Sequence, residues 1–371
     1  MAEYLTNTAE LTAVANAIRE KGGTSEQLAC PDGFVAAIQA IQTGVPLQIA
    51  VATNAGATVT ATKGSKTVSG TADTSGHCTL TVDEAGTWTV TVATASTTKT
   101  SDVVVGISNV DLPLVDSVLN NNSWETIKKV SDAGQGENYW SVGDRKAVTL
   151  NGTVGKLSLS NVTIYAFIIG FNHNASVEGA NRIHFQLAKT ALSGGTDVAL
   201  CDSNYDNAGQ GFCMNTNNLN SGGWASSHMR KVICGTSLSS YSGTIIAVIP
   251  AALRAVLKSV TKYTNNKGNN SAASAVTATT DYFFLLSEYE VFGSTSYANR
   301  YEANKQAQYS YYSAGNSKLK YKHNDTSTVA YWWFRSPDAS NNMNFVIVFY
   351  NGGVLSTNAR FSLGFAPGFC V

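Results

Sequence analysis

The sequence predicts an α+β protein in three parts, and three patterns predict it. Apolar residues recur with helical spacing in residues 1–44, alternate with polar residues in residues 46–106, and follow both patterns in residues 107–371. A chain of 371 residues is long enough for two or three domains with a substantial core. We therefore expect a helical segment, a β-sandwich and a larger mixed domain.

Residues 1–44 are expected to form a helical hairpin. The apolar face of its first helix consists of Leu11, Val14, Ala15 and Ile18. The second helix follows the capping residue Asp32 and carries Phe34, Val35, Ile38 and Ile41. Two helices of this size bury too little apolar surface to be stable alone. The hairpin therefore packs on its own chain, or it mediates self-association or docking into a larger assembly. The segment resembles amino-terminal segments of gut-phage tail proteins, and this resemblance supports docking.

Residues 46–106 are expected to form a small spacer domain. Apolar and polar residues alternate in 57–62, 78–82 and 88–92, and turn clusters separate these runs. Short strands at this spacing are typical of a β-sandwich, and the segment resembles bacterial immunoglobulin-like modules. Trp88 is interpreted as a core residue, and nothing in the segment indicates chemistry.

Residues 107–371 combine both kinds of element. Asn122 or Ser123 can cap a helix that carries Trp124, and Pro250 stands where the first turn of another helix belongs. The strands that we expect are 146–150, 163–169, 182–187, 282–286 and 345–350. The long Asn- and Gly-rich connections between them are typical of functional loops on a compact frame.

Composition excludes several classes of function. Lys and Arg together number 25, as do Asp and Glu, and this neutral chain lacks the positive field that nucleic-acid binding requires. The amino terminus carries Glu3 and Glu10 without the apolar core of a signal peptide. The most apolar run, 245–257, is interrupted by Pro250 and Arg254 and is too short to span a bilayer. We expect synthesis in a cytoplasm and no membrane insertion.

No catalytic motif is evident. HExxH, Walker A and GxSxG motifs are absent, and the five histidines lack metal-ligand spacing. His173 and His184 lie near Glu178, which suggests either a site or polar packing within strands. The six cysteines lack CxxC spacing and are interpreted mostly as free buried thiols, although Cys201 and Cys213 can pair. We expect no metal, no cofactor and no enzymatic activity.

The most informative segment is the carboxy-terminal one. The aromatic block 331–337 and the Gly/Pro-punctuated block 364–369 flank a stretch rich in Asn, Ser, Gly, Phe and Tyr. Asn and Ser offer adaptable hydrogen bonds, while Tyr and Phe offer large contact area at low entropy cost. A rigid frame around a permissive loop indicates a recognition surface.

This segment also lacks particular residue types. Residues 334–371 contain no Lys, Glu, Gln or Trp, whereas the first 333 residues contain 17 Lys, 11 Glu, 9 Gln and 6 Trp. Codons that descend from AAC by substitution at the two adenines encode none of these four, and no Met. Met343 is the exception and must be an untargeted position.

The blocks 332–337, Asn351-Gly352-Gly353 and 364–369 resemble the carboxy-terminal signature of the variable proteins of diversity-generating retroelements. The upstream blocks 138–144 and 171–174 are also similar, so the resemblance covers roughly 115–371. It implies a C-type-lectin-like fold and a receptor-binding tip whose loop residues are rewritten by adenine-directed mutagenic reverse transcription. Phe334 departs from the commoner Leu but remains apolar. The calcium-binding motifs of sugar-binding lectins are missing, which argues against calcium-dependent sugar chelation.

The predicted variable region is about 337–365. Its expected ligand-binding residues are Asp338, Ser340, Asn341, Asn342, Asn344, Phe345, Phe349, Tyr350, Asn351, Ser356, Thr357, Asn358, Arg360, Phe361 and Leu363. The expected scaffold residues are Trp332, Trp333, Arg335, Pro337, Gly352, Gly353, Gly364 and Pro367. We expect Arg335 to tie loop carbonyls or a carboxylate with its fork of donors. An ordinary solvated loop is the alternative interpretation of the region.

These observations predict a phage tail receptor-binding protein in the virion, without catalytic residues. Its expected partners are a bacterial cell-surface ligand, either protein or glycan, other virion tail proteins, and further copies of itself, with a trimer as one possible homo-oligomer. The alternatives are an enzyme of the formylglycine-generating type, which shares the lectin-like fold, and a non-diversified structural virion protein or bacterial surface protein.

Overall fold

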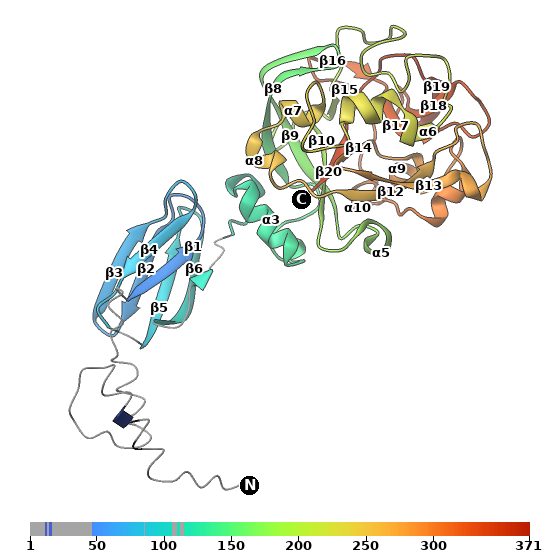
Figure 1. Cartoon of the computed structure of the whole chain (residues 1–371). Helices are drawn as coiled ribbons and strands as arrows, with labels where there is room; N and C mark the ends of the chain where they lie inside the picture. The colour runs from blue at the N-terminus through green and yellow to red at the C-terminus, as the bar shows by residue number, and fades with distance from the viewer. Residues whose placement is uncertain (1–11, 13–14, 17–46, 85, 106–109, 112–114) are drawn as a thin grey trace. The chain divides into compact units, whose positions relative to one another are not determined.

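The structure is a computed structural model that describes residues 12, 15–16, 47–84, 86–105, 110–111 and 115–371 (Figure 1). It divides into two compact units, Met1–Asp116 and Ser117–Val371. The division falls ten residues beyond the boundary predicted at 106. The predicted amino-terminal hairpin lies outside the described residues.

The predicted fold class is wrong as stated. Strands predominate over helices in the described part of the chain, and they form several separate sheets where we expected an α+β fold. Most of the described helices are single turns, and the longest of them is α3 (Trp124–Asp132). Glycine ends two of the single-turn helices, since Gly179 follows Glu178 and Gly293 follows Phe292.

The first unit consists of two sheets around one core. The order of the strands is β4-β1-β7 in one sheet and β3-β2-β5-β6 in the other. Their bounds are β1 Gln48–Ala52, β2 Thr58–Lys63, β3 Lys66–Thr71, β4 His77–Thr81, β5 Gly86–Ala93, β6 Thr98–Val105 and β7 Val110–Asp111. Trp88 lies fully buried in this core, and its indole donates to the Glu84 carbonyl at 3.1 Å. The alternating runs of the sequence coincide with β2, β4 and β5.

A five-stranded antiparallel sheet forms the centre of the second unit, with the order β14-β20-β10-β9-β8. Its strands are β8 Arg145–Val154, β9 Leu157–Phe171, β10 Ile183–Lys189, β14 Phe283–Phe284 and β20 Gly368–Cys370. The carboxy-terminal strand β20 thus lies inside the sheet. The buried Val371 extends the pairing, since its carbonyl accepts a hydrogen bond from the Ile183 amide at 3.0 Å.

Helix α3 covers part of this sheet. Ser123 is the N-cap of this helix, and its hydroxyl accepts a hydrogen bond from the Thr126 amide at 3.0 Å. The Trp124 ring packs edge-on against Phe185 of β10 and Phe369 of β20. The other described α-helices are α4 Gly136–Tyr139, α5 Ala175–Glu178, α6 Gly223–Ser226, α7 Ile245–Val248, α8 Ala251–Arg254, α9 Glu288–Phe292 and α10 Ser310–Ser313.

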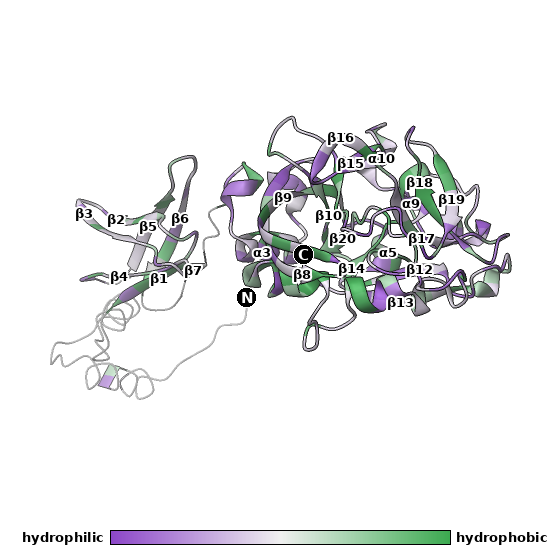
Figure 2. Ribbon diagram, turned by 90° about the horizontal axis from the view of Figure 1, so that it is seen from above, coloured by the Kyte–Doolittle hydropathy of each residue, from purple (hydrophilic) through white to green (hydrophobic). Residues whose placement is uncertain are grey.

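Three smaller sheets surround the central one, with the orders β11-β15-β16, β12-β13 and β17-β18-β19. Their bounds are β11 Val198–Ala199, β12 Val260–Asn265, β13 Val276–Asp281, β15 Lys320–Lys322, β16 Asp325–Ala330, β17 Trp332–Pro337, β18 Asn344–Val348 and β19 Val354–Asn358. Figure 2 colours β18 as hydrophobic, in agreement with its buried Phe-Val-Ile-Val run.

Two predicted elements are shorter than expected. The helix after Pro250 ends at Arg254, although the apolar spacing of Leu253, Val256, Leu257 and Val260 predicts a longer one, and Val260 begins β12. The predicted strand 282–286 contains only the two residues of β14. Short apolar runs satisfy helix and strand patterns equally, so tertiary packing decides between them. No helix of the described residues has the length and apolar character to cross a bilayer.

Candidate ligand-binding surface

Four of the predicted scaffold residues, Trp332, Trp333, Arg335 and Pro337, lie in β17. Trp332 and Trp333 are fully buried, and their indole N–H groups donate to the carbonyls of Lys318 and Phe212, both at 2.9 Å. Pro337 and Pro367 are buried as well. Each indole therefore satisfies its polar atom while it fills the core, as buried tryptophans require.

Arg335 anchors β17 to the rest of the unit. Its fully buried guanidinium donates to both carboxylate oxygens of Glu290, and also to the Leu285 carbonyl and the Thr264 hydroxyl at 2.9 and 2.8 Å. The residue thus binds a carboxylate and a loop carbonyl together, which were the two expected partners. The planar guanidinium of arginine suits this bidentate contact, whereas the ammonium of a lysine does not.

Glu290 belongs to a larger buried ionic cluster. The Lys262 ammonium donates to Glu178 and Glu290 at 2.6 and 2.9 Å, and to the Tyr309 hydroxyl at 2.8 Å. Burial tends to raise the pKa of Glu290, but the charges of Arg335 and Lys262 overcome it and hold that pKa well below its usual range. Burial raises the pKa of Glu178 to about 7 against the opposing charge of Lys262.

This cluster contains the described group with the most metal-like geometry. Ligand atoms of His173, Glu178 and Glu290 lie within 4.8 Å of one another. The Lys262 ammonium already lies between the two carboxylates and supplies the positive charge that a metal ion would bring. Burial lowers the pKa of His173 to about 3, so its imidazole is neutral at pH 7. The geometry therefore indicates polar packing, one of the two interpretations left open by the sequence.

The predicted display residues fall into three groups. The exposed ones are Ser340, Asn342, Tyr350, Asn351 and Arg360. The half-buried ones are Asn341, Asn344, Phe349, Ser356, Thr357, Asn358 and Phe361. The buried ones are Asp338, Phe345 and Leu363. We correct the assignment of these last three, because buried side chains belong to the frame and cannot contact an external ligand.

Asp338 shows why a polar residue of the loop belongs to the frame. Its Oδ1 accepts hydrogen bonds from the backbone amides of Ser340 and Asn341 at 2.9 and 3.1 Å, and its Oδ2 accepts one from the Ser356 hydroxyl at 2.6 Å. The carboxylate therefore shapes the turn after β17 and links it to β19. Asn and Asp side chains commonly stabilise turns in this way.

Asn220, which we did not single out from the sequence, binds the backbone of the same loop. Only 1% of this residue is exposed. Its side-chain amide group lies within 2.8–3.0 Å of the carbonyls of Asp338, Asn341 and Asn344, and its backbone amide donates to the Asn342 carbonyl at 2.8 Å. These contacts all involve backbone oxygens of the loop. They fix the path of the chain without restricting the side chains at 341, 342 and 344.

Main-chain contacts also hold the second part of the variable region. The Ala359 amide donates to the Met343 carbonyl at 2.8 Å, and the Ala359 carbonyl accepts from the Asn215 amide at 3.0 Å. The Arg360 carbonyl accepts from the Gly209 amide at 2.6 Å. The exposed Arg360 side chain therefore projects from a backbone that neighbouring segments fix.

Two of the predicted scaffold glycines have clear steric reasons. Gly352 adopts a φ of 81°, which glycine tolerates best, in the turn between β18 and β19, where Gly353 follows. At Gly364 a Cβ atom would lie 2.7 Å from both the Ala199 Cβ and the Tyr331 carbonyl oxygen. Close approach of the chain therefore requires glycine at 364.

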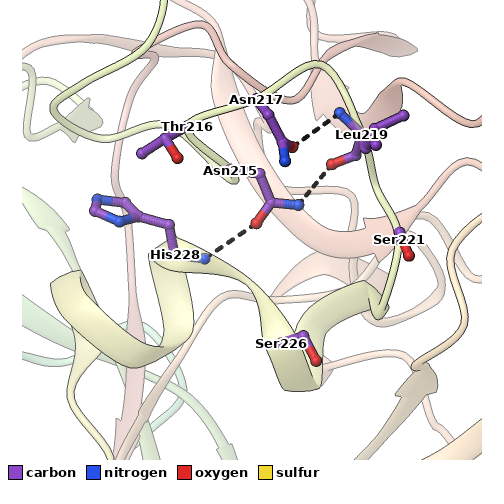
Figure 3. A pocket seen from close by; sticks show the side chains of 7 residues that line it. All are labelled: Asn215, Thr216, Asn217, Leu219, Ser221, Ser226 and His228. Carbon is purple, nitrogen blue, oxygen red and sulfur yellow. Dashed lines mark hydrogen bonds between the residues drawn. The ribbon is translucent and has the colours of Figure 1, made fainter.

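An open pocket of about 420 Å³ lies beside this surface. Seven side chains line it, as Figure 3 shows: Asn215, Thr216, Asn217, Leu219, Ser221, Ser226 and His228. Its loop is continuous with the display surface through the backbone bonds of Asn215 and Asn220 to Ala359 and Asn342. Sequence reasoning missed the pocket. The sequence feature that marks this segment is the Asn-rich run 215–220, and the spacing of its residues does not indicate a binding site.

The cysteines offer no activated nucleophile among the described residues. Cys78, Cys201, Cys213, Cys234 and Cys370 are free and buried. Burial raises the pKa of Cys201 to about 12 and that of Cys213 to about 11, so both are protonated thiols at pH 7. The possible pairing of Cys201 with Cys213 is not present.

A comparison with known families finds a similarity for the carboxy-terminal part of the chain. Residues 200–371 match the model of a family described as a domain of unknown function, DUF6273. The match begins after β8, β9 and β10, although these strands pair in one sheet with β20 inside it. The folded unit is therefore larger than the matched segment. A comparison with curated proteins finds no match.

Proposed function

We propose that this chain is a binding protein of a phage tail whose second unit displays a diversified ligand-binding surface. The display positions are the exposed residues Ser340, Asn342, Tyr350, Asn351 and Arg360. The observation that carries the proposal is the way the loop is fixed, since the Asn220 side chain binds the backbone carbonyls of Asp338, Asn341 and Asn344 and no side chain of the loop. The resemblance to variable proteins of diversity-generating retroelements supports the same function.

The energetic costs of substitution differ between the exposed display residues and the buried residues that maintain the fold. Exposed substitutions away from caps and special backbone positions usually change the free energy of unfolding by only about 0.5 kcal/mol in either direction. Truncation of a core aromatic residue such as Trp333 costs about 3–5 kcal/mol. The unit can therefore accept many combinations of display residues while its buried residues maintain the fold.

Tyr350 and Arg360 are suited to recognition. Tyr350 is 55% exposed and packs against Phe349, which in turn packs against Tyr331, so its ring is supported on one side and available to a ligand on the other. Tyr and Arg are among the residue types that dominate binding energy at interfaces. Weak binding at each tip suffices if an oligomer presents several copies, because simultaneous binding raises the overall affinity about 10²–10⁴-fold.

The test is adsorption of the purified chain to a panel of bacterial strains. We expect Tyr350→Ala and Arg360→Ala to change which strains are bound, with the midpoint of thermal unfolding nearly unchanged. Lys128→Ala is the control, because Lys128 is a half-buried cation on α3, which both views of the unit draw far from β18 and β19 (Figures 1 and 2). If the control and the display variants bind the same strains equally, the proposal is wrong.

The genome provides an independent test of diversification. We expect a reverse transcriptase gene and a near-copy of the 3′ end of this gene beside it. Sister copies of the gene should differ at the exposed positions of 340–360 more than elsewhere. Differences spread evenly over the chain would leave only a non-diversified binding or structural protein.

A further inference from the structure

The pocket beside the display surface has the chemistry of a ligand site. Thr216, Ser221 and Ser226 contribute hydroxyl groups, and Figure 3 draws no hydrogen bond from any of them to another lining residue. Asn217 uses its Oδ1 to accept from the Leu219 amide at 3.1 Å, so its Nδ2 donors do not take part in that bond. The volume of about 420 Å³ lies within the range of small-molecule pockets, about 300–1,000 Å³.

The lining carries no formal charge. None of its seven residues is Asp, Glu, Lys or Arg. Burial lowers the pKa of His228, against a backbone hydrogen bond with Gly211 that raises it, so the imidazole is neutral at pH 7. A cationic ligand would find no carboxylate and an anionic ligand no ammonium or guanidinium. The ligand class that fits is therefore neutral and rich in hydrogen-bonding groups.

Asn215 makes the pocket rigid. Its Oδ1 accepts from the His228 amide at 3.1 Å, and its Nδ2 donates to the Leu219 carbonyl at 2.7 Å (Figure 3). One side chain thus connects the loop that carries Leu219 with the start of the π-helical turn η2 (Met229–Cys234). Preorganised polar groups lose little entropy on binding, which favours recognition of small ligands.

Leu219 gives the pocket an apolar patch, since it is 44% exposed among hydroxyl and amide groups. A sugar ring combines hydroxyl groups at its edge with an apolar C–H face, and this pairing matches the lining. A protein partner would instead be expected to insert an aromatic or Arg anchor into a desolvated pocket. This open polar pocket lacks the apolar walls and the carboxylate that such anchors require.

We infer that the pocket of Asn215–His228 is a fixed subsite that binds a neutral saccharide unit, while the adjacent display residues select among larger ligands that carry it. The inference rests on the proposed binding function and adds a ligand class to it. The main-chain bonds of Asn215 and Asn220 to the variable region place this fixed subsite directly against the display surface.

The experiment is a titration of the full chain, labelled with ¹⁵N, with the methyl glycosides of glucose, galactose, mannose and N-acetylglucosamine. We expect at least one of them to shift the amide resonances of 215–228. Asn217→Asp retains the Oδ1 acceptor of the turn but removes the Nδ2 donor, and we expect it to weaken that binding about tenfold. Ser226→Ala should weaken it in the same direction. Ser158→Ala, in the β9 strand, is the control and should leave the affinity unchanged.

The possible outcomes are distinguishable. Absence of any shift in 215–228 at millimolar glycoside would overturn the subsite, even if Tyr350→Ala and Arg360→Ala still change strain choice. Loss of cell adsorption in Asn217→Asp without any glycoside shift would assign the pocket to a protein ligand and overturn the saccharide assignment. Glycoside shifts with unchanged strain choice in both display variants would support the subsite and refute the variable display surface.

Discussion

Replacement of Asn220 by Ala tests how the loop is held. The side chain supplies two N–H hydrogens to three loop carbonyls and accepts the Asn269 amide at 3.1 Å. Two N–H hydrogens and one acceptor make three hydrogen bonds of about 0.5–1.5 kcal/mol each, so their loss lowers the free energy of unfolding by about 1.5–4.5 kcal/mol. For a unit of this size we expect a decrease in melting temperature of about 2–4 °C per kcal/mol.

The assay is urea unfolding followed by tryptophan fluorescence, combined with amide hydrogen exchange. The Asp338 and Ala359 amides, which donate to the carbonyls of Asn344 and Met343, should lose protection in Asn220→Ala. Asn220→Asp should destabilise more than Ala, because it directs a buried carboxylate at the three carbonyls. Asn342→Ala is the matched control and should change stability by no more than about 0.5 kcal/mol. If Asn220→Ala costs no more than this control, the argument about the loop is refuted.

Two further predictions concern the buried charges. Arg335→Leu leaves Glu290 next to Lys262 alone and should cost about 3–5 kcal/mol in urea unfolding, and a cost below about 1 kcal/mol would contradict the anchoring role. Burial raises the pKa of Glu302 to about 7 from its ordinary 4.5, so the folded state retains a proton that the unfolded state releases, and stability is lost as pH rises through this window. Glu302→Gln should therefore gain about 3 kcal/mol relative to the wild type between pH 4 and pH 8, whereas a pH-independent difference would show that this carboxyl is ionised in the fold.

The predicted strands agree best with the structure where apolar and polar residues alternate without interruption. The alternation in 57–62 and 88–92 coincides with β2 and β5, because a two-sheet core buries every second side chain. The helix after Ser123 was predicted from its cap and its apolar spacing. The mainly β character was missed, because single-turn helices and short strands leave no distinct period in the sequence.

The candidate site was only partly predictable. The sequence indicated the aromatic frame and the exposed loop, but it could not separate Asp338, Phe345 and Leu363 from their exposed neighbours. Polar residues in turns serve the backbone as often as a ligand, and only the contacts of Asp338 distinguish the two. The role of Asn220 depends on contacts with a segment more than 100 residues away, as in its bond to Asp338. No local pattern reports such a contact.

The most direct test of the account is a library of the full chain randomised at Ser340, Asn342, Tyr350, Asn351 and Arg360, sorted separately for protease resistance and for binding to bacterial strains. We predict that most members remain as resistant as the parent and that different members bind different strains. A library in which most members become protease-sensitive, or in which all folded members bind the parental strains alone, would contradict the claim that a fixed frame carries a freely variable binding surface.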